Sequence, residues 1–288
     1  VNGAYGERMV QIAARHRLAA EVLRWPENQV TDPVLVQRRL AGDASITHVA
    51  VVHCETTTGI LNPVETIGRL VQSAERGFIV DAMSSFGGIP LSLSGAAIDF
   101  LISSANKCLE GVPGFCFVLA RKAKLAACEG RARTLSLDLF EQWRGLDLNG
   151  QFRFTPPTHA ILAFAQALRE FDAEGGVAAR AKRYQANHAA VLAGMTALGF
   201  RPYLSPKDQS WIITAFHYPG NPGFRFEDFY RRLAEHGLVI YPGKLGHVAC
   251  FRIANIGRLT ATDIQELLDA VATVLRAMTL SLPVAPPR

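Results

Sequence analysis

The sequence predicts an α/β protein with a mostly parallel sheet, flanking helices and a smaller C-terminal α+β domain. One observation is a set of short apolar runs rich in β-branched residues, at 46–54, 78–82, 98–105 and 115–121. Runs of this kind are typical of buried strands in a parallel sheet. The other observation is that segments with helical periodicity separate strand-like runs, as the helices that cover a parallel sheet do.

The segment between the first two apolar runs shows how such a covering helix is marked. Pro63 precedes it, and apolar residues recur at helical spacing from Val64 to Val71. Gly77 then provides a helix stop just before the next apolar run. We therefore predict a strand, a helix and a strand in this order over residues 46–82.

The second half of the chain has a different pattern, with longer helices and fewer strands. We predict helices at 155–171, 176–200, 224–237 and 259–278, and strands at 211–218 and 250–255. The first of these helices begins at a Thr-Pro signal. The arrangement predicts a large cofactor-binding domain over residues 1–170, a small C-terminal domain over 171–280 and a disordered tail at 281–288.

Composition and charge argue against several classes of protein. Of the 288 residues, 49% are hydrophobic and 19% are charged, which is typical of a soluble globular protein. A net charge of +5 without a dense Lys/Arg run argues against nucleic acid as a partner, and the apolar stretches are too short to span a membrane. Five scattered cysteines without a CxxC pair suit reduced thiols and a cytoplasmic location. The dispersed histidines match no metal site.

Polar side chains follow three of the predicted strands, at the point where each strand ends. The segments are HCETTTG (53–59), VDAMSS (80–85) and SSANK (103–107). In α/β sheets, ligands bind outside the carboxyl ends of the strands. If the three strands are neighbours, Thr56, Asp81 and Lys107 converge on one pocket.

A lysine and an acid that converge at a sheet edge fit the cofactor pyridoxal phosphate (PLP). The Lys107 amine bonds covalently to the cofactor aldehyde, and Asp81 keeps the ring nitrogen protonated so that the ring withdraws electrons. Hydroxyl groups of Thr56, Ser84 or Ser104 can bond the ring oxygen or the phosphate. Because Lys107 lies among small and apolar residues, we expect burial to favour its neutral amine.

Each of these residues also has an ordinary structural explanation. A single lysine is about ten times more often a solvated surface group than a catalyst. Asp81 can cap a turn, and the threonines before Gly59 can form local turns. Arg252 lies between Phe251 and Ile253 and needs a bound anion or a structural acid. Of these two, a salt bridge is the more common arrangement.

The sequence also carries motifs that resemble those of a known family. The matching stretches run in family order over nearly the whole chain: NGAYGERM (2–9), HCETTTGILNP (53–63), VDAMSSFGGIP (80–90), SSANKCLEGVPGF (103–115), LSLDLFEQW (135–143), RFTPPTH (153–159), YPGK (241–244) and FRIANIG (251–257). The chain resembles the class V aminotransferases of PLP fold type I. Within them it is similar to the subfamily that acts on 2-aminoethylphosphonate and pyruvate.

The resemblance implies a role for each residue that would bind the cofactor. Lys107 holds the cofactor covalently, Asp81 pairs with the ring nitrogen and Tyr5 stacks on the ring. Thr56 bonds the phenolic oxygen of the cofactor. Thr155 reaches the cofactor phosphate of the neighbouring subunit, so the resemblance implies a homodimer with shared active sites.

The resemblance also implies a reaction, in which Arg252 holds the anionic end of each substrate. An amino group passes from 2-aminoethylphosphonate to pyruvate, which gives phosphonoacetaldehyde and L-alanine. Family members carry a further segment upstream of Tyr5, with a phosphate-binding Ser-Gly-Thr loop at a helix start. We therefore expect this chain to lack the N-terminal part of the cofactor domain. Two alternatives stay open: another class V aminotransferase that uses an amino acid and a 2-oxo acid, or a truncated non-catalytic protein of the same fold.

Overall fold

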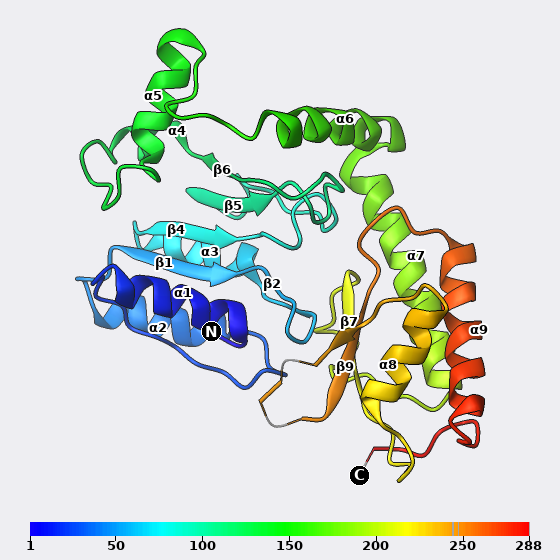
Figure 1. Ribbon diagram of the computed structural model, residues 1–288. Coiled ribbons are helices and arrows are strands. Elements are labelled where there is room, and N and C mark those ends of the chain that lie inside the picture. The colour runs from blue at the N-terminus through cyan, green and yellow to red at the C-terminus, as the bar shows by residue number, and fades with distance from the viewer. Residues whose placement is uncertain (244, 247, 288) are drawn as a thin grey trace.

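A computed structural model describes residues 1–243, 245–246 and 248–287, and its strands form two main sheets and a short hairpin (Figure 1). The larger sheet has the strand order β1 (His48–Val52), β4 (Gly77–Asp81), β5 (Phe100–Ser104) and β6 (Cys116–Ala120). β1, β4 and β5 pair in parallel, and β6 is antiparallel to β5. The predicted mostly parallel sheet is confirmed, because the buried apolar runs are local signals that the sequence displays directly.

A short hairpin follows β1 and brings the first half of the chain against the second. Its strands are β2 (Cys54–Glu55) and β3 (Ile60–Leu61). Gly59, at its turn, has a φ angle of 95°. A Cβ atom on Gly59 would lie 2.3 Å from the carbonyl oxygen of Ile213, in the second sheet. Glycine therefore permits both the backbone angle and the close approach.

Three helices accompany the parallel strands: α1 (Ala4–Arg15), α2 (Pro33–Gly42) and α3 (Val64–Ser73). The hydrophobic core of this half joins apolar side chains of α2 and α3 to those of β4 and β5, among them Val36, Ile67, Phe78 and Leu101. α3 lies where the sequence predicts it. α1 and α2 follow no apolar pattern clear enough to predict their extent, although the Asp32 side chain caps α2 by accepting the N–H of Val34.

An arm projects from the sheet after β6, at the top of Figure 1. It carries α4 (Lys122–Ala126) and α5 (Leu139–Asn149), after which the chain returns into α6 (Thr158–Glu174) and α7 (Gly176–Ala197). α6 begins later than the predicted residue 155, at Thr158. The reason is that Pro156 and Pro157 each disfavour the helical conformation of the residue before them.

The second sheet is antiparallel, with the order β7 (Ile213–His217), β9 (Cys250–Ala254) and β8 (Tyr241–Pro242). α8 (Phe226–Glu235) and α9 (Ala261–Ala277) lie beside it together with α7 (Figure 1). Aromatic rings fill its core, where Phe251 of β9 contacts Phe200, Phe216 and Phe229. The predicted C-terminal α+β arrangement is confirmed.

The two sheets have separate hydrophobic cores, and a smaller third core combines residues of both halves, among them Cys54, Cys108 and Ile213. We propose on this basis that the domain boundary lies near residue 170, between 1–170 and 171–280. We predict a disordered tail over residues 281–288, but within the described part, residues 281–287, the chain packs against the rest of the protein. Val284 is buried, and its N–H donates to the carbonyl oxygen of Leu198 at 2.8 Å. Arg288, and Lys244 of the YPGK stretch, lie outside the described residues.

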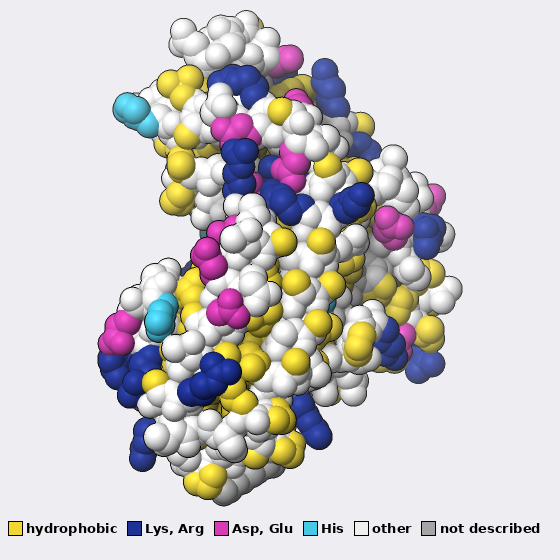
Figure 2. All heavy atoms as spheres, turned by 90° about the vertical axis from the view of Figure 1, so that its right-hand side faces the viewer, with side chains coloured by type: hydrophobic (Ala, Val, Ile, Leu, Met, Phe, Trp, Pro, Cys, Tyr) yellow, Lys and Arg dark blue, Asp and Glu magenta, His cyan; other side chains and the backbone are white. Residues whose placement is uncertain are grey.

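The outer face near α7 and α9 carries charged side chains of both signs. Figure 2 shows the basic and acidic groups interspersed there, with hydrophobic side chains between them. No helix in the described ranges is both long enough and apolar enough to cross a bilayer.

Candidate active site

The carboxyl ends of β1, β4 and β5 meet at one edge of the larger sheet. Val52 pairs with Asp81 in register, and Asp81 pairs with Ile102. Hydrogen bonds continue past the strands, since the N–H of His53 donates to the carbonyl oxygen of Asp81 at 2.8 Å. The segments that carry Thr56, Asp81 and Lys107 therefore start from neighbouring strand ends, as the sequence predicts.

Asp81 is a half-buried acid without a full set of partners. Its Oδ1 accepts the N–H of Met83 at 2.9 Å, and Oδ2 has no hydrogen-bond partner among the described residues. Burial raises the pKa of Asp81, against the opposing effects of the Met83 N–H and the Arg8 guanidinium. A buried carboxylate of this kind is stabilised by a cationic N–H donor.

Lys107 lies in a turn just beyond β5. The turn is closed by two backbone hydrogen bonds, from Glu110 N–H to the Lys107 carbonyl and from Gly111 N–H to the Ala105 carbonyl, both at 2.8 Å. The side chain of Lys107 is exposed. The expectation of burial is therefore wrong for this chain by itself, because the turn projects Lys107 beyond the apolar residues that flank it in sequence.

Glu55 is a functional residue that sequence reasoning missed. Its carboxylate is fully buried, and Oε2 accepts the N–H groups of Tyr5 at 2.9 Å and Gly6 at 3.1 Å. These are N–H groups of the first turn of α1, where a negative charge is favourable. Glu55 thereby fixes the start of α1, and with it the position of Tyr5. The available signal was an acid at the end of an apolar strand with no basic residue nearby in sequence.

Tyr5 lies among charged groups of the candidate site. The guanidinium carbon of Arg8 is 5.1 Å from the centre of the Tyr5 ring. Against the larger effect of burial, the Arg8 guanidinium lowers the pKa of Asp81. Tyr5 is near enough to Arg252 to raise the pKa of that guanidinium, again against the larger effect of burial. The N-terminal turn of α1 is therefore within electrostatic range of both Asp81 and Arg252.

Arg252, on β9, is buried without an acidic partner. It is only 5% exposed, and its Nη1 donates to the carbonyl oxygen of Thr56 at 2.8 Å while Nε donates to that of Pro242 at 3.1 Å. None of the ion pairs between described residues includes Arg252. The salt bridge that the sequence left open is therefore absent from the described part of the chain, and a buried, unpaired guanidinium favours a bound anion.

Thr56 is distinguished from its two threonine neighbours by its contacts. Thr57 donates to the Glu55 carboxylate, and the Thr58 hydroxyl accepts the N–H of Ile60. These two threonines carry the local turn roles. The Thr56 hydroxyl makes no hydrogen bond to a described residue, so it is available to a ligand.

Two of the other predicted hydroxyl groups are already engaged. Ser84 donates to the carbonyl oxygen of Cys54 at 3.0 Å, and Ser104 donates to that of Met83 at 3.3 Å. They fix the turns beside Asp81 rather than face a ligand. Thr155 is exposed on the segment between α5 and α6 and makes no hydrogen bond or ion pair with the other described site residues.

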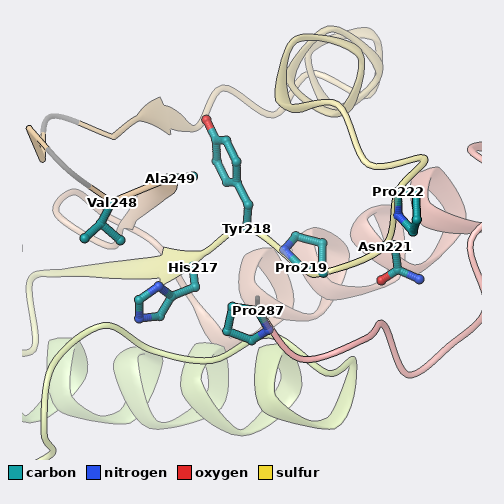
Figure 3. A pocket seen from close by; sticks show the side chains of 9 residues that line it. His217, Tyr218, Pro219, Asn221, Pro222, Val248, Ala249 and Pro287 are labelled. Carbon is teal, nitrogen blue, oxygen red and sulfur yellow. The ribbon is translucent and has the colours of Figure 1, made fainter.

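Two hollows lie in the C-terminal half of the chain. One of about 460 Å³ is lined by His217, Tyr218, Asn221 and Val248, with Pro287 of the C-terminal segment at its side (Figure 3). A second, of about 490 Å³, lies beside it and is lined by Phe226 and Tyr230 among others. Neither hollow is lined by Thr56, Asp81, Lys107 or Arg252.

The fold and the converging strand ends define the class of this protein. The family model for class V aminotransferases matches residues 7–261, and the chain belongs to this family. The class uses PLP as its cofactor, and the fold is PLP fold type I.

Individual proteins are similar over most of the chain. The chain is 54% identical over 275 residues to the 2-aminoethylphosphonate–pyruvate transaminase of Salmonella paratyphi C, covering 95% of this chain and 75% of that protein. The same figures hold for the relative from Salmonella enteritidis PT4. The structure superposes on pyridoxamine–pyruvate aminotransferase from Mesorhizobium loti with a TM-score of 0.88 and 27% identity, covering 98% of this chain and 73% of that one. Ureidoglycine–glyoxylate aminotransferase from Bacillus subtilis has the same TM-score and coverage at 24% identity.

Proposed function

We propose that the protein transfers the amino group of 2-aminoethylphosphonate to pyruvate, giving phosphonoacetaldehyde and L-alanine. Membership of the class V aminotransferases supports the reaction type. The 54% identity to transaminases of that name supports the substrates. The observation that carries the proposal is Arg252, a buried guanidinium without an acid partner, held against the strand ends through the Thr56 carbonyl.

The residues at the sheet edge fit PLP. Asp81 has an unpartnered carboxylate oxygen and a pKa that burial raises, which suits the protonated nitrogen of a pyridine ring. The Thr56 hydroxyl suits the phenolic oxygen, and Tyr5, whose backbone N–H is bonded by Glu55, carries a ring that suits the ring face. Lys107 supplies the amine that would hold the cofactor covalently. When bound, the cofactor supplies an electron sink for the amine-bearing carbon.

The mechanism assigns one task to each side chain. Arg252 holds the phosphonate of the donor, and later the carboxylate of pyruvate, through charge-assisted hydrogen bonds. This fixes the reacting carbon relative to Lys107, whose amine, once the donor amine has displaced it, would remove a proton from that carbon and deliver it to the cofactor within the same half reaction. With pyruvate the proton would move in the opposite direction. Asp81 would keep the ring nitrogen of the cofactor protonated in both halves of the reaction. The Lys107 amine must be neutral to accept the proton, and closure of the exposed site by a ligand or a second subunit favours that form.

We propose further that the working form is a homodimer. Large apolar side chains are exposed on the arm and the adjacent part of α6: Leu135, Leu137, Leu139, Leu146, Leu148, Phe152, Phe154 and Leu162. An apolar surface of this kind favours a protein partner. A second copy of the chain is the partner that also explains the implied role of Thr155, which follows Phe154 on this surface.

We also propose a cytoplasmic location, supported by the thiols. All five cysteines are free, and a reducing compartment keeps them so.

Absorbance and substrate assays test the function. Addition of PLP to the wild-type chain is expected to produce a band between about 390 and 430 nm, from the covalent link to Lys107. Lys107→Ala should not show it. A wild-type protein that stays colourless would support the non-catalytic alternative.

Amine donors separate the two catalytic hypotheses. Two assays are compared. In one, 2-aminoethylphosphonate is the donor and pyruvate the acceptor; in the other, serine or alanine is the donor and a 2-oxo acid the acceptor. We expect kcat/KM to be higher in the first. A dianionic, tetrahedral phosphonate and a planar carboxylate place different demands on the group that binds them. A preference for the amino acids would favour the alternative class V activity.

A further inference from the structure

A partly buried cluster of four charged residues joins α7 to the turn that carries Lys107. Arg180 and Arg183 of α7 face Glu174, at the end of α6, and Glu110, three residues after Lys107. The cluster contains two cations and two anions, so its formal charge is balanced. Arg180 is only 2% exposed. Balance matters here, because a buried charge without its partner is costly.

The cluster holds the Lys107 turn at two points. Nη1 of Arg180 donates to the carbonyl oxygen of Cys108, the residue after Lys107, at 2.8 Å. The Glu110 carboxylate accepts from Arg183 Nη2 at 2.9 Å and from the Tyr184 hydroxyl at 2.5 Å. Glu110 has a φ angle of 58°, which a residue with a side chain rarely adopts. Such a conformation persists where the surrounding contacts fix it.

The same α7 side chains also hold the segment that follows β9. Nη1 of Arg183 donates to the carbonyl oxygen of Gly257 at 2.6 Å, and the Gly257 N–H donates to the Tyr184 hydroxyl at 3.3 Å. The Asn255 side chain donates to the Tyr184 carbonyl at 3.1 Å. β9 carries Arg252, three residues before Asn255. One turn of α7 therefore contacts both the Lys107 turn and the end of the Arg252 strand.

We propose that Glu110, Arg180, Arg183 and Tyr184 form a positioning unit that sets Lys107 relative to Arg252. The proposal rests on the proposed function, in which Lys107 moves a proton at the carbon whose anionic end Arg252 holds. The distance between these two side chains then decides whether that carbon lies within reach. Lys107 and Arg252 make no direct contact in the described structure, and α7 is a support that both of their segments share.

The first test uses Glu110→Gln, which keeps the shape of the side chain but removes one of the two negative charges. We expect faster amide hydrogen exchange in both the 103–111 and the 250–257 segments, by about tenfold or more. β1 and β4 should keep their wild-type protection. The matched control is Glu235→Gln, which removes a carboxylate from the exposed ion pair with Arg231 on α8 and should leave both segments unchanged.

The second variant, Tyr184→Phe, removes only the hydroxyl that bridges Glu110 and Gly257. It leaves all four charges in place, so it serves if Glu110→Gln does not fold. We expect the same two segments to loosen together. With PLP and both substrates present, either variant should lower kcat/KM by up to about 10²-fold, as misplacement of reacting groups by about 1 Å does.

The outcomes are distinguishable. Coupled loosening of both segments with reduced kcat/KM supports the positioning unit. Loosening of the Lys107 turn alone, or wild-type exchange in both segments, overturns it. Exchange is measured with and without PLP, so it decides the coupling even if the wild-type chain fails to bind the cofactor, a result that would overturn the proposed function instead.

Discussion

Arg252 shows at the scale of one residue how burial and partners decide a role. Its guanidinium is held by two carbonyl oxygens and has no acid partner in the described part of the chain. Carbonyl oxygens fix its orientation without neutralising its charge. Burial lowers the pKa of Arg252 and the charge of Glu55 opposes this effect, but neither provides an ion pair, which is why we propose that Arg252 binds an anionic ligand.

We predict that Arg252→Lys raises KM for both 2-aminoethylphosphonate and pyruvate by about tenfold or more. A point ammonium cannot reproduce the fork of donors, and hydrogen bonds to charged groups contribute about 1.5–3 kcal/mol each. Steady-state kinetics with each substrate varied in turn measure the effect. The control is Arg258→Lys, because Arg258 is 83% exposed a few residues further along the chain. An unchanged KM for both substrates would show that Arg252 does not bind their anionic ends.

The residues that sequence reasoning recovered are those with local signals. Asp81 and Lys107 follow apolar runs, so their place at the strand ends could be predicted without knowing the rest of the structure. Glu55 could not be predicted in this way, because its partners are N–H groups about fifty positions earlier in the chain. The exposure of Lys107 was also missed, since apolar neighbours in sequence do not show which way a turn projects.

At the scale of elements, the start of α1 depends on a close approach to the hairpin. A Cβ atom on Gly3 would lie 2.2 Å from Cγ of Glu55 and 2.4 Å from its Cδ. Glu55 cannot simply move aside, because its carboxylate is held by the first turn of α1 and by Thr57. The glycine is therefore required by space rather than by its backbone angle, which is extended.

We predict that Gly3→Ala lowers the free energy of unfolding by about 1–3 kcal/mol, the usual cost of overpacking. Thermal or denaturant unfolding measures this. Gly42→Ala at the end of α2 is the matched control, since a Cβ there meets nothing within 4 Å. It should leave stability unchanged or slightly higher. Equal effects of the two substitutions would contradict the tight packing of Gly3 against Glu55.

The observed boundaries of helices and ordered segments differ from the predicted ones where proline residues or distant packing determine them. The Thr-Pro signal at residue 155 predicted a helix start, but two consecutive prolines delay α6 to Thr158. The C-terminal segment looked disordered from its prolines, yet Val284 joins the hydrophobic core of the second sheet. When one apolar residue stands in a proline-rich stretch, the sequence does not show whether a distant part of the chain packs against it.

For the whole molecule, we predict that acid weakens the fold through His53. Burial lowers the pKa of His53 to about 4, and its Nδ1 lies 2.9 Å from the Ser85 hydroxyl. In the unfolded chain His53 binds a proton near its ordinary pKa of about 6.5. Between these values the unfolded state binds more protons, so stability is lost as the pH falls from about 6.5 towards 4, by about 3 kcal/mol.

His53→Asn should flatten this part of the pH dependence, whereas His236→Asn, at an exposed position, should not. Denaturant unfolding at several pH values between 4 and 7 provides the measurement. Burial also lowers the pKa values of His188 and His217, so part of the slope should remain in the variant. A slope that is the same in wild type and His53→Asn would refute this role.

Assembly into the proposed homodimer is tested at the scale of the whole molecule. Leu148 is 82% exposed on α5, within the apolar surface proposed to meet a second copy. We predict that the wild-type protein sediments at twice the 31.4 kDa mass of the chain, and that Leu148→Glu shifts it towards the monomer. A charge in the apolar centre of an interface must be desolvated without a partner.

Loss of the dimer should also remove activity, because in the proposed dimer Thr155 completes the site of the neighbouring subunit. Val239→Glu is the matched control: Val239 is similarly exposed but lies just before β8, away from the arm. It should leave both the mass and kcat/KM at their wild-type values. A monomeric wild-type protein with full transaminase activity would remove the need for a second subunit, and with it the role proposed for Thr155.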